Sequence, residues 1–71
     1  MNLIEHRIVE IHSVEDVTEQ FERKVGIKPR EPFFQVDLTH DCYGQVTREK
    51  KYFYQTEWEV AKLKGYFMAW R

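Results

Sequence analysis

Alternation of apolar and polar side chains between Phe33 and Thr39 limits this chain to a fold that contains a β-sheet. Even-numbered positions of this segment are apolar, and the odd-numbered positions after Phe33 are polar, which is typical of a half-buried strand. Residues 41–44, Asp-Cys-Tyr-Gly, then fit a type I turn with Asp first and Gly last. Residues 46–54 are therefore predicted to return as the second arm of a β-hairpin.

Two other stretches show the spacing of helices. The first begins at Ser13, whose hydroxyl suits an N-cap, and ends at Gly26, which suits a left-handed residue after a helix. The second begins at Thr56, which forms a Thr-x-x-Glu capping box with Glu59, and ends at Gly65. The apolar face of the first consists of Val14, Val17, Phe21 and Val25, and the broad apolar stripe of the second consists of Trp58, Val60, Ala61 and Leu63.

Strands predicted at residues 3–12 and 66–70 complete the order β-α-β-β-α-β. We therefore expect one small α+β domain over residues 1–71, with an antiparallel sheet and both helices on one face, as in a ferredoxin-like fold. Residues 48–51, Arg-Glu-Lys-Lys, are polar at every position, although a ferredoxin-like sheet holds this strand in its interior. The alternative is a smaller α+β sheet whose lysine-rich strand lies at an edge or in a projecting hairpin.

The length and composition exclude several classes of protein. A chain of 71 residues buries only about 60% of its unfolded surface, so small domains of this kind often need a disulfide, a metal or a second subunit. Cys42 is the only cysteine, which excludes a disulfide within the chain. A hydrophobic content of 42% argues against disorder, and no apolar run approaches the roughly 20 residues of a membrane span. Without an export signal, we expect a cytoplasmic protein.

Metal-binding and catalytic residue types are sparse. His40, Asp41 and Cys42 form the one cluster of potential ligands, short of the four that a structural zinc site uses, so we predict no metal and no cofactor. We expect Cys42 to be a solvent-facing free thiol. His6 and His12 lie six apart on a strand and are expected to share a face, where a proton-transfer or sensing role is the alternative to a plain surface position. With no glycine-rich phosphate loop either, we predict a non-catalytic protein without a small-molecule substrate.

Nucleic-acid binding is the alternative function that the sequence suggests. Residues 44–71 carry a net charge of +3, whereas residues 1–20 carry −4. On a strand, four basic and aromatic side chains of residues 48–54 point the same way, so that cations meet phosphates while rings stack on bases. The small residues of the RNA-recognition signature are missing from this run. The residues of this alternative site are Arg48, Lys50, Lys51, Tyr52 and Tyr54.

Protein–protein association is the leading expectation. Alternation places Phe67 on one face of the last strand and Tyr66, Met68 and Trp70 on the other, and a small sheet can bury only one of these sets. The exposed set predicts a homodimer or a complex with another protein. Tyr52 and Tyr54 are expected beside it if their strand is a neighbour.

Residues 53–68 resemble small uncharacterised proteins of Gram-positive phages, prophages and mobile elements. The resemblance is carried by Thr56-Glu57-Trp58-Glu59, then Ala61-Lys62, then Gly65-Tyr66. It covers under a quarter of the chain, and part of it is helix-capping sequence that any short helix can share. It implies no activity, but it implies an accessory protein that acts by binding a host factor, a phage protein or nucleic acid.

Overall fold

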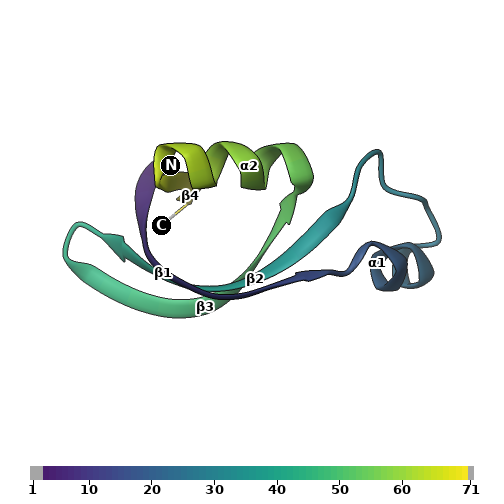
Figure 1. Ribbon diagram of the computed structural model, residues 1–71, viewed down its shortest axis with the longest axis horizontal. Helices are drawn as coiled ribbons and strands as arrows, with labels where there is room; N and C mark the ends of the chain where they lie inside the picture. The colour runs from purple at the N-terminus through teal and green to yellow at the C-terminus, as the bar shows by residue number, and fades with distance from the viewer. Residues whose placement is uncertain (1–2, 71) are drawn as a thin grey trace.

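The structure is a computed structural model that describes residues 3–70, except for the side chain of Trp70. Its four strands form one antiparallel sheet in the order β3-β2-β1-β4, accompanied by two helices (Figure 1). The predicted α+β class and the order of the elements are confirmed. The elements are β1 (Leu3–Asp16), α1 (Thr18–Val25), β2 (Phe33–Cys42), β3 (Gln45–Tyr54), α2 (Gln55–Lys64) and β4 (Tyr66–Trp70).

The strand order is that of the smaller sheet, not of a ferredoxin-like fold. β3, with its polar residues 48–51, lies at one edge, and β4 lies at the other. β1 and β2 are direct antiparallel neighbours, so α1 joins two adjacent strands instead of crossing over a third. An edge position suits a strand rich in lysine, because the charges discourage pairing with other chains.

Strand β1 is bent by two irregularities in its pairing with β2. The register shifts between Ile8 and Glu10 and again between Ile11 and Ser13, and such bulges increase local bend and twist. The strands accordingly curve around the space that α2 occupies (Figure 1). We call the side of the sheet toward α2 the inner face and the opposite side the outer face.

The hydrophobic core lies between the inner face and α2. Val36 and Leu38 of β2 are fully buried there, because α2 covers them with Trp58 and Ala61. Phe53 of β3 and Phe67 of β4 complete this cluster, with ring centroids 5.4 Å apart. The alternation predicted for β2 is therefore confirmed, since its even-numbered side chains from Val36 to Cys42 are buried.

Helix α1 differs from its prediction in both start and position. It begins at Thr18, because pairing with β2 keeps β1 extended as far as Asp16, whose carboxylate accepts from the Thr18 N–H at 2.9 Å. The helix lies beyond the end of the strands (Figure 1). Its Phe21 packs against Phe33, at 4.6 Å between centroids, and Phe33 alternates with core residue Phe34. The two helices therefore do not share one face: α2 covers the inner face and α1 contacts the outer.

Two further local predictions are corrected by backbone geometry. Helix α2 begins before Thr56: Glu57 accepts from the Tyr54 N–H at 3.0 Å, and Glu31 accepts from the Thr56 N–H at 2.6 Å. The hairpin turn has positive φ at Tyr43 (51°) and Gly44 (88°), which is the pattern of a type I′ turn and matches strand twist better than type I. The predicted helix ends at Gly26 and Gly65 are confirmed.

Candidate protein-binding surface

The molecule exposes more surface than its mass predicts. Its accessible area is 5278 Å², whereas a compact monomer of 8.7 kDa exposes about 4,700 Å². Its radius of gyration is 12.8 Å, against about 11 Å for a compact domain of this length. The excess follows from the architecture, because a ten-residue helix cannot cover a sheet whose longest strand has 14 residues.

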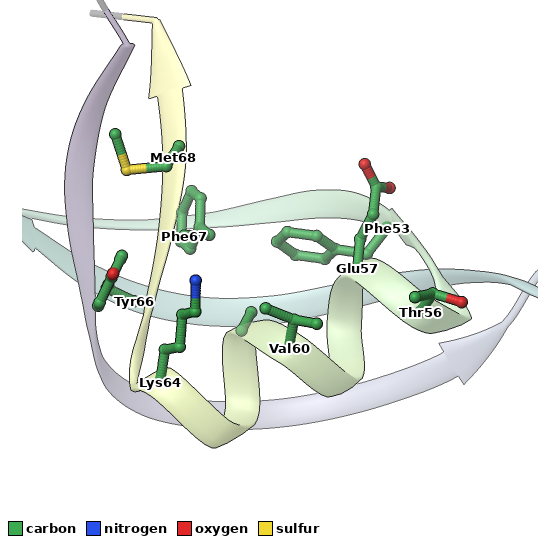
Figure 2. Close-up of a pocket in the computed structure, with 9 residues that line it drawn as sticks. Phe53, Thr56, Glu57, Val60, Lys64, Tyr66, Phe67 and Met68 are labelled. Carbon is green, nitrogen blue, oxygen red and sulfur yellow. The ribbon is translucent and has the colours of Figure 1, made fainter.

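An apolar groove lies between α2 and β4 (Figure 2). Phe53, Ala61 and Phe67 form its apolar depth, and its volume is about 360 Å³. Met68 of β4 and Val60 of α2 stand at its sides with 49% and 43% of their surface exposed. The groove is also lined by Thr56, Glu57, Lys64 and Tyr66.

The outward side of α2 continues this apolar surface. Leu63 is 86% exposed, one helical turn from Val60. Trp58 and Ala61, on the opposite side of the helix, are each 3% exposed and anchor α2 to the sheet. We use the name α2 surface for Val60 and Leu63 together with the flanking Glu57 and Lys64.

The sequence predicted one broad apolar stripe of Trp58, Val60, Ala61 and Leu63, but the structure divides it between two sides of the helix. The spacing of these four residues along the helix already indicates this division. Each pair is three residues apart, but the two pairs are offset by two residues, or about 200° around a helix. One pair must therefore face away from the sheet if the other faces toward it.

The predicted partner-binding residues divide between two places. In β4, Phe67 is 7% exposed and Met68 is 49% exposed, which confirms the predicted alternation, and Tyr66 lines the groove. The side chain of Trp70 lies outside the described part of the chain. Tyr52 and Tyr54 are on β3, which is separated from β4 by β2 and β1, so the strands are not neighbours and these residues do not lie beside Tyr66 and Met68.

Tyr52 instead borders a second hollow, beneath α1. This hollow has a volume of about 490 Å³, and Tyr52 stacks on Phe33 at its edge, with ring centroids 5.6 Å apart. Tyr54 is covered by Arg30, whose guanidinium carbon lies 4.6 Å from the ring centroid. The other residues of the hollow are Val17, Gln20, Phe21, Lys24 and Val25.

The basic and aromatic residues of β3 do not all form one surface. Arg48, Lys50, Tyr52 and Tyr54 share the outer face, as predicted, because each pairs with an odd-numbered residue of β2. Asp37 accepts two hydrogen bonds from Arg48, at 3.2 and 3.1 Å, and also faces Lys50 in the register. The guanidinium lowers the pKa of Asp37, so this carboxylate stays ionised and offsets the charge of Arg48. Lys51 lies on the inner face, with its Nζ 5.7 Å from the centre of the Phe67 ring.

A buried histidine cluster joins three strands under Phe67. His40 contacts Glu49 through Nε2, and its Nδ1 lies 3.2 Å from Nδ1 of His6. If His40 donates to the carboxylate, its Nδ1 accepts from His6 and leaves Nε2 of His6 unprotonated. That atom is buried without a hydrogen-bond partner among the described residues. The pKa of His6 is lowered, first by burial and then by the neighbouring His40.

This cluster was not found from the sequence. His6 and His40 are 34 residues apart, and only the β1–β2 register brings them together. The prediction that His6 and His12 share a face is wrong, because the bulges intervene and His12 bonds Thr39 on the outer face at 2.8 Å. The stacking of His6 on Phe67, at 5.3 Å, makes the cluster part of the core packing.

The remaining candidate for chemistry is Cys42. It is a free cysteine, but it is only 5% exposed, so the expectation of a solvent-facing thiol is wrong. Between residues 3 and 70, three or more histidine, cysteine or acidic side chains do not gather where they could hold a metal ion. Over the same range, every helix is too short or too polar to cross a membrane.

Comparison with known proteins gave no match: no family model fits the sequence, and no curated protein or solved structure matches it. The α2 surface is therefore the feature from which a function can be inferred.

Proposed function

We propose that this protein is a small, non-catalytic accessory or regulatory protein that acts by binding another protein molecule, and that the α2 surface is its binding site. An accessory role in a phage or mobile element, which the resemblance of residues 53–68 implies, is part of this proposal. So is a cytoplasmic location, because the free thiol of Cys42 suits a reducing compartment.

The observation that carries the proposal is the contrast between the two sides of α2. Trp58 and Ala61 fix the helix to the sheet, so the opposite side is held in place and its conformation costs little entropy on binding. That opposite side presents Val60 and Leu63 to solvent beside an apolar groove. Rigid apolar side chains next to a groove, with charges at the margin, are the usual composition of an interface core and rim.

Nucleic-acid binding by β3 is supported less well. It needs cations that are free to meet phosphates, but Arg48 is held by Asp37, and Lys51 lies on the other face of the sheet from Lys50. Acidic residues of β1, including Glu10 and Glu15, pair with β2 positions on the same outer face. Their negative charge repels a phosphate backbone.

A co-purification experiment tests the proposal. A tagged copy is mixed with an untagged copy in cell extract, bound proteins are cross-linked before washing so that weak complexes are kept, and the proteins retained are identified by mass spectrometry. We expect the wild type to retain a partner, either the untagged copy or another protein, and Val60→Asp to lose it. Val25→Asp is the matched control, because Val25 of α1 is similarly exposed (51% against 43%) but lies outside the α2 surface.

Either of two results would reject the proposal. One is that the cross-linked wild type retains neither the untagged copy nor another protein. The other is that Val25→Asp, and not Val60→Asp, abolishes retention, which would move the binding site to the hollow beneath α1. Circular dichroism checks that both variants keep the fold.

A further inference from the structure

We propose that the protein which covers the α2 surface is a second copy of this chain, bound with its α2 antiparallel to the first across a two-fold axis. This inference rests on the proposed function and names its partner. Three features support a second copy: the charge pattern of α2, the apolar side chains between the charges, and the neighbouring strand β4.

The charges of α2 are arranged for antiparallel pairing with itself. Glu57 and Glu59 lie in its first half, and Lys62 and Lys64 lie in its second half. When two such helices run antiparallel, the acidic half of each lies against the basic half of the other. A parallel pair would place like charges together, which is destabilising. The pattern therefore selects one orientation.

The register follows from residues on one flank of the helix. Glu57 and Lys64 both line the groove, so they lie on the same flank of the exposed pair Val60 and Leu63. A two-fold axis that passes between positions 60 and 61 places Glu57 opposite the partner's Lys64, and Lys64 opposite the partner's Glu57. Val60 and Leu63 then meet the same residues of the other copy. One apolar contact and two ion pairs form together.

Two features of the structure favour the binding of a second copy at the α2 surface. Glu57 accepts a hydrogen bond from the Tyr54 N–H at 3.0 Å, which fixes its carboxylate at the start of α2. Met68 also lines the groove, but its side chain lies on the opposite side of β4 from Phe67 (Figure 2). The sequence of β4, Tyr-Phe-Met-Ala-Trp, has no charged residue, so the approach of a second copy meets no like charge on this strand.

The expected dimer is weak. Two helices of ten residues bury less than the roughly 1,600 Å² of a standard stable interface. We therefore expect a dissociation constant on the order of 10 μM, which makes the dimer sensitive to single charges.

Sedimentation velocity over a range from micromolar to millimolar protein tests this inference. We expect a reversible monomer–dimer equilibrium for the wild type. Lys64→Glu creates two pairs of like charges in a symmetric dimer, and we expect it to weaken association by about tenfold. Glu57→Lys is expected to do the same. Glu22→Lys on α1 is the control and leaves the equilibrium unchanged.

Mixing the two variants gives the decisive result. In a mixed dimer every contact between positions 57 and 64 again joins opposite charges, so an equimolar mixture of Lys64→Glu and Glu57→Lys is expected to associate about as tightly as the wild type. Because Glu57 also caps α2, circular dichroism must first show that each variant retains its helix content.

A wild type that stays monomeric at millimolar concentration overturns the inference. A dimer that neither reversal weakens, or a mixture no tighter than its components, overturns it too. These outcomes are separable from the failure of the proposed function, because a monomer that still retains a different protein through Val60 keeps the binding function and loses only the second copy as partner.

Discussion

The two helices are similar in length but differ in how much of their surface they bury against the sheet. Helix α2 buries Trp58 and Ala61 in the core and touches β2, β3 and β4. In α1 all eight residues are exposed or half-buried, and Phe21 on Phe33 is its main aromatic contact with the sheet. Length and helix propensity do not explain this difference, since isolated helices of either size are marginal in water. The positions of the helices explain the difference in burial, because α2 crosses the concave face of the sheet and α1 lies beyond its end (Figure 1).

This contrast decides which apolar surface is the better binding site. The hollow beneath α1 is larger than the groove beside α2, but one of its walls is a helix with few buried contacts. Regions with few buried apolar contacts open at low free-energy cost, so that wall is expected to move. Buried Trp58 fixes α2 to the sheet, so the outward side of the helix is preorganised. A preorganised surface loses less conformational entropy when a partner covers it.

The largest expected effect comes from removing the anchor of each helix in turn. Trp58→Ala should lower the free energy of unfolding by about 3–5 kcal/mol, because it empties the centre of the core, and this approaches the whole stability of a small domain. Phe21→Ala should cost less, about 1–2 kcal/mol, because the side chain is only half-buried. Urea denaturation followed by tryptophan and far-ultraviolet signals measures both. Equal losses would remove the distinction between the helices.

A smaller effect is expected from pH, and it should arise at the α2 end of the molecule. The pKa of His6 is lowered on folding, so the unfolded chain binds more protons than the native state below about pH 6.5. Stability from this group is therefore complete above that pH and is lost as the pH falls, by at most about 1.4 kcal/mol per pH unit. Urea midpoints measured between pH 7.5 and pH 5 should fall for the wild type.

The variant His6→Phe separates the contribution of His6 to this pH dependence from the contributions of the carboxyl groups and the other histidines. It keeps a ring stacked on Phe67 but cannot take up a proton, so its stability should vary less over the same pH range. An identical slope in both proteins would show that His6 does not contribute to the pH dependence.

The smallest expected effects concern the side chains that cap the two helices. Glu31 accepts from the Thr56 N–H, and Asp16 accepts from the hydroxyl and the N–H of Thr18. In both cases these bonds lower the pKa of the carboxyl. Glu31→Ala and Asp16→Ala should each lower Tm by a few degrees at neutral pH. Because a lowered pKa gives stability that disappears on protonation, both losses should shrink as the pH falls below 4. Calorimetry at pH 7 and pH 3 checks this, and a constant loss would contradict it.

The sequence was sufficient for features that depend on local chemistry. Alternation located β2, and the glycines at positions 26 and 65 marked the helix ends, because their left-handed backbone strongly favours glycine. The polar run at 48–51 correctly favoured an edge strand. The alternation of Phe67 and Met68 also located one side of the groove.

Features that depend on pairing between distant segments were missed. The spacing from Val14 to Val25 is genuinely helical, but cross-strand pairing of Val14 with Val36 outweighs it and delays α1 until Thr18. The contact between His6 and His40 needs both bulges and register, neither of which the local sequence specifies. Burial of Cys42 likewise follows from its even position in β2, because the strand extends into the turn predicted at residues 41–44.

The central claim is that another protein molecule covers the outward side of α2 and leaves the α1 end in solvent. Hydroxyl-radical footprinting of the purified complex, compared with the free chain, tests it most directly, because it reports the exposure of individual leucine, valine, isoleucine and methionine side chains. Oxidation of Leu63 and Val60 should fall strongly in the complex, and oxidation of Val25 and Ile27, exposed by 51% and 68%, should not change. Protection of Val25 and Ile27 with continued oxidation of Leu63 would contradict the claim.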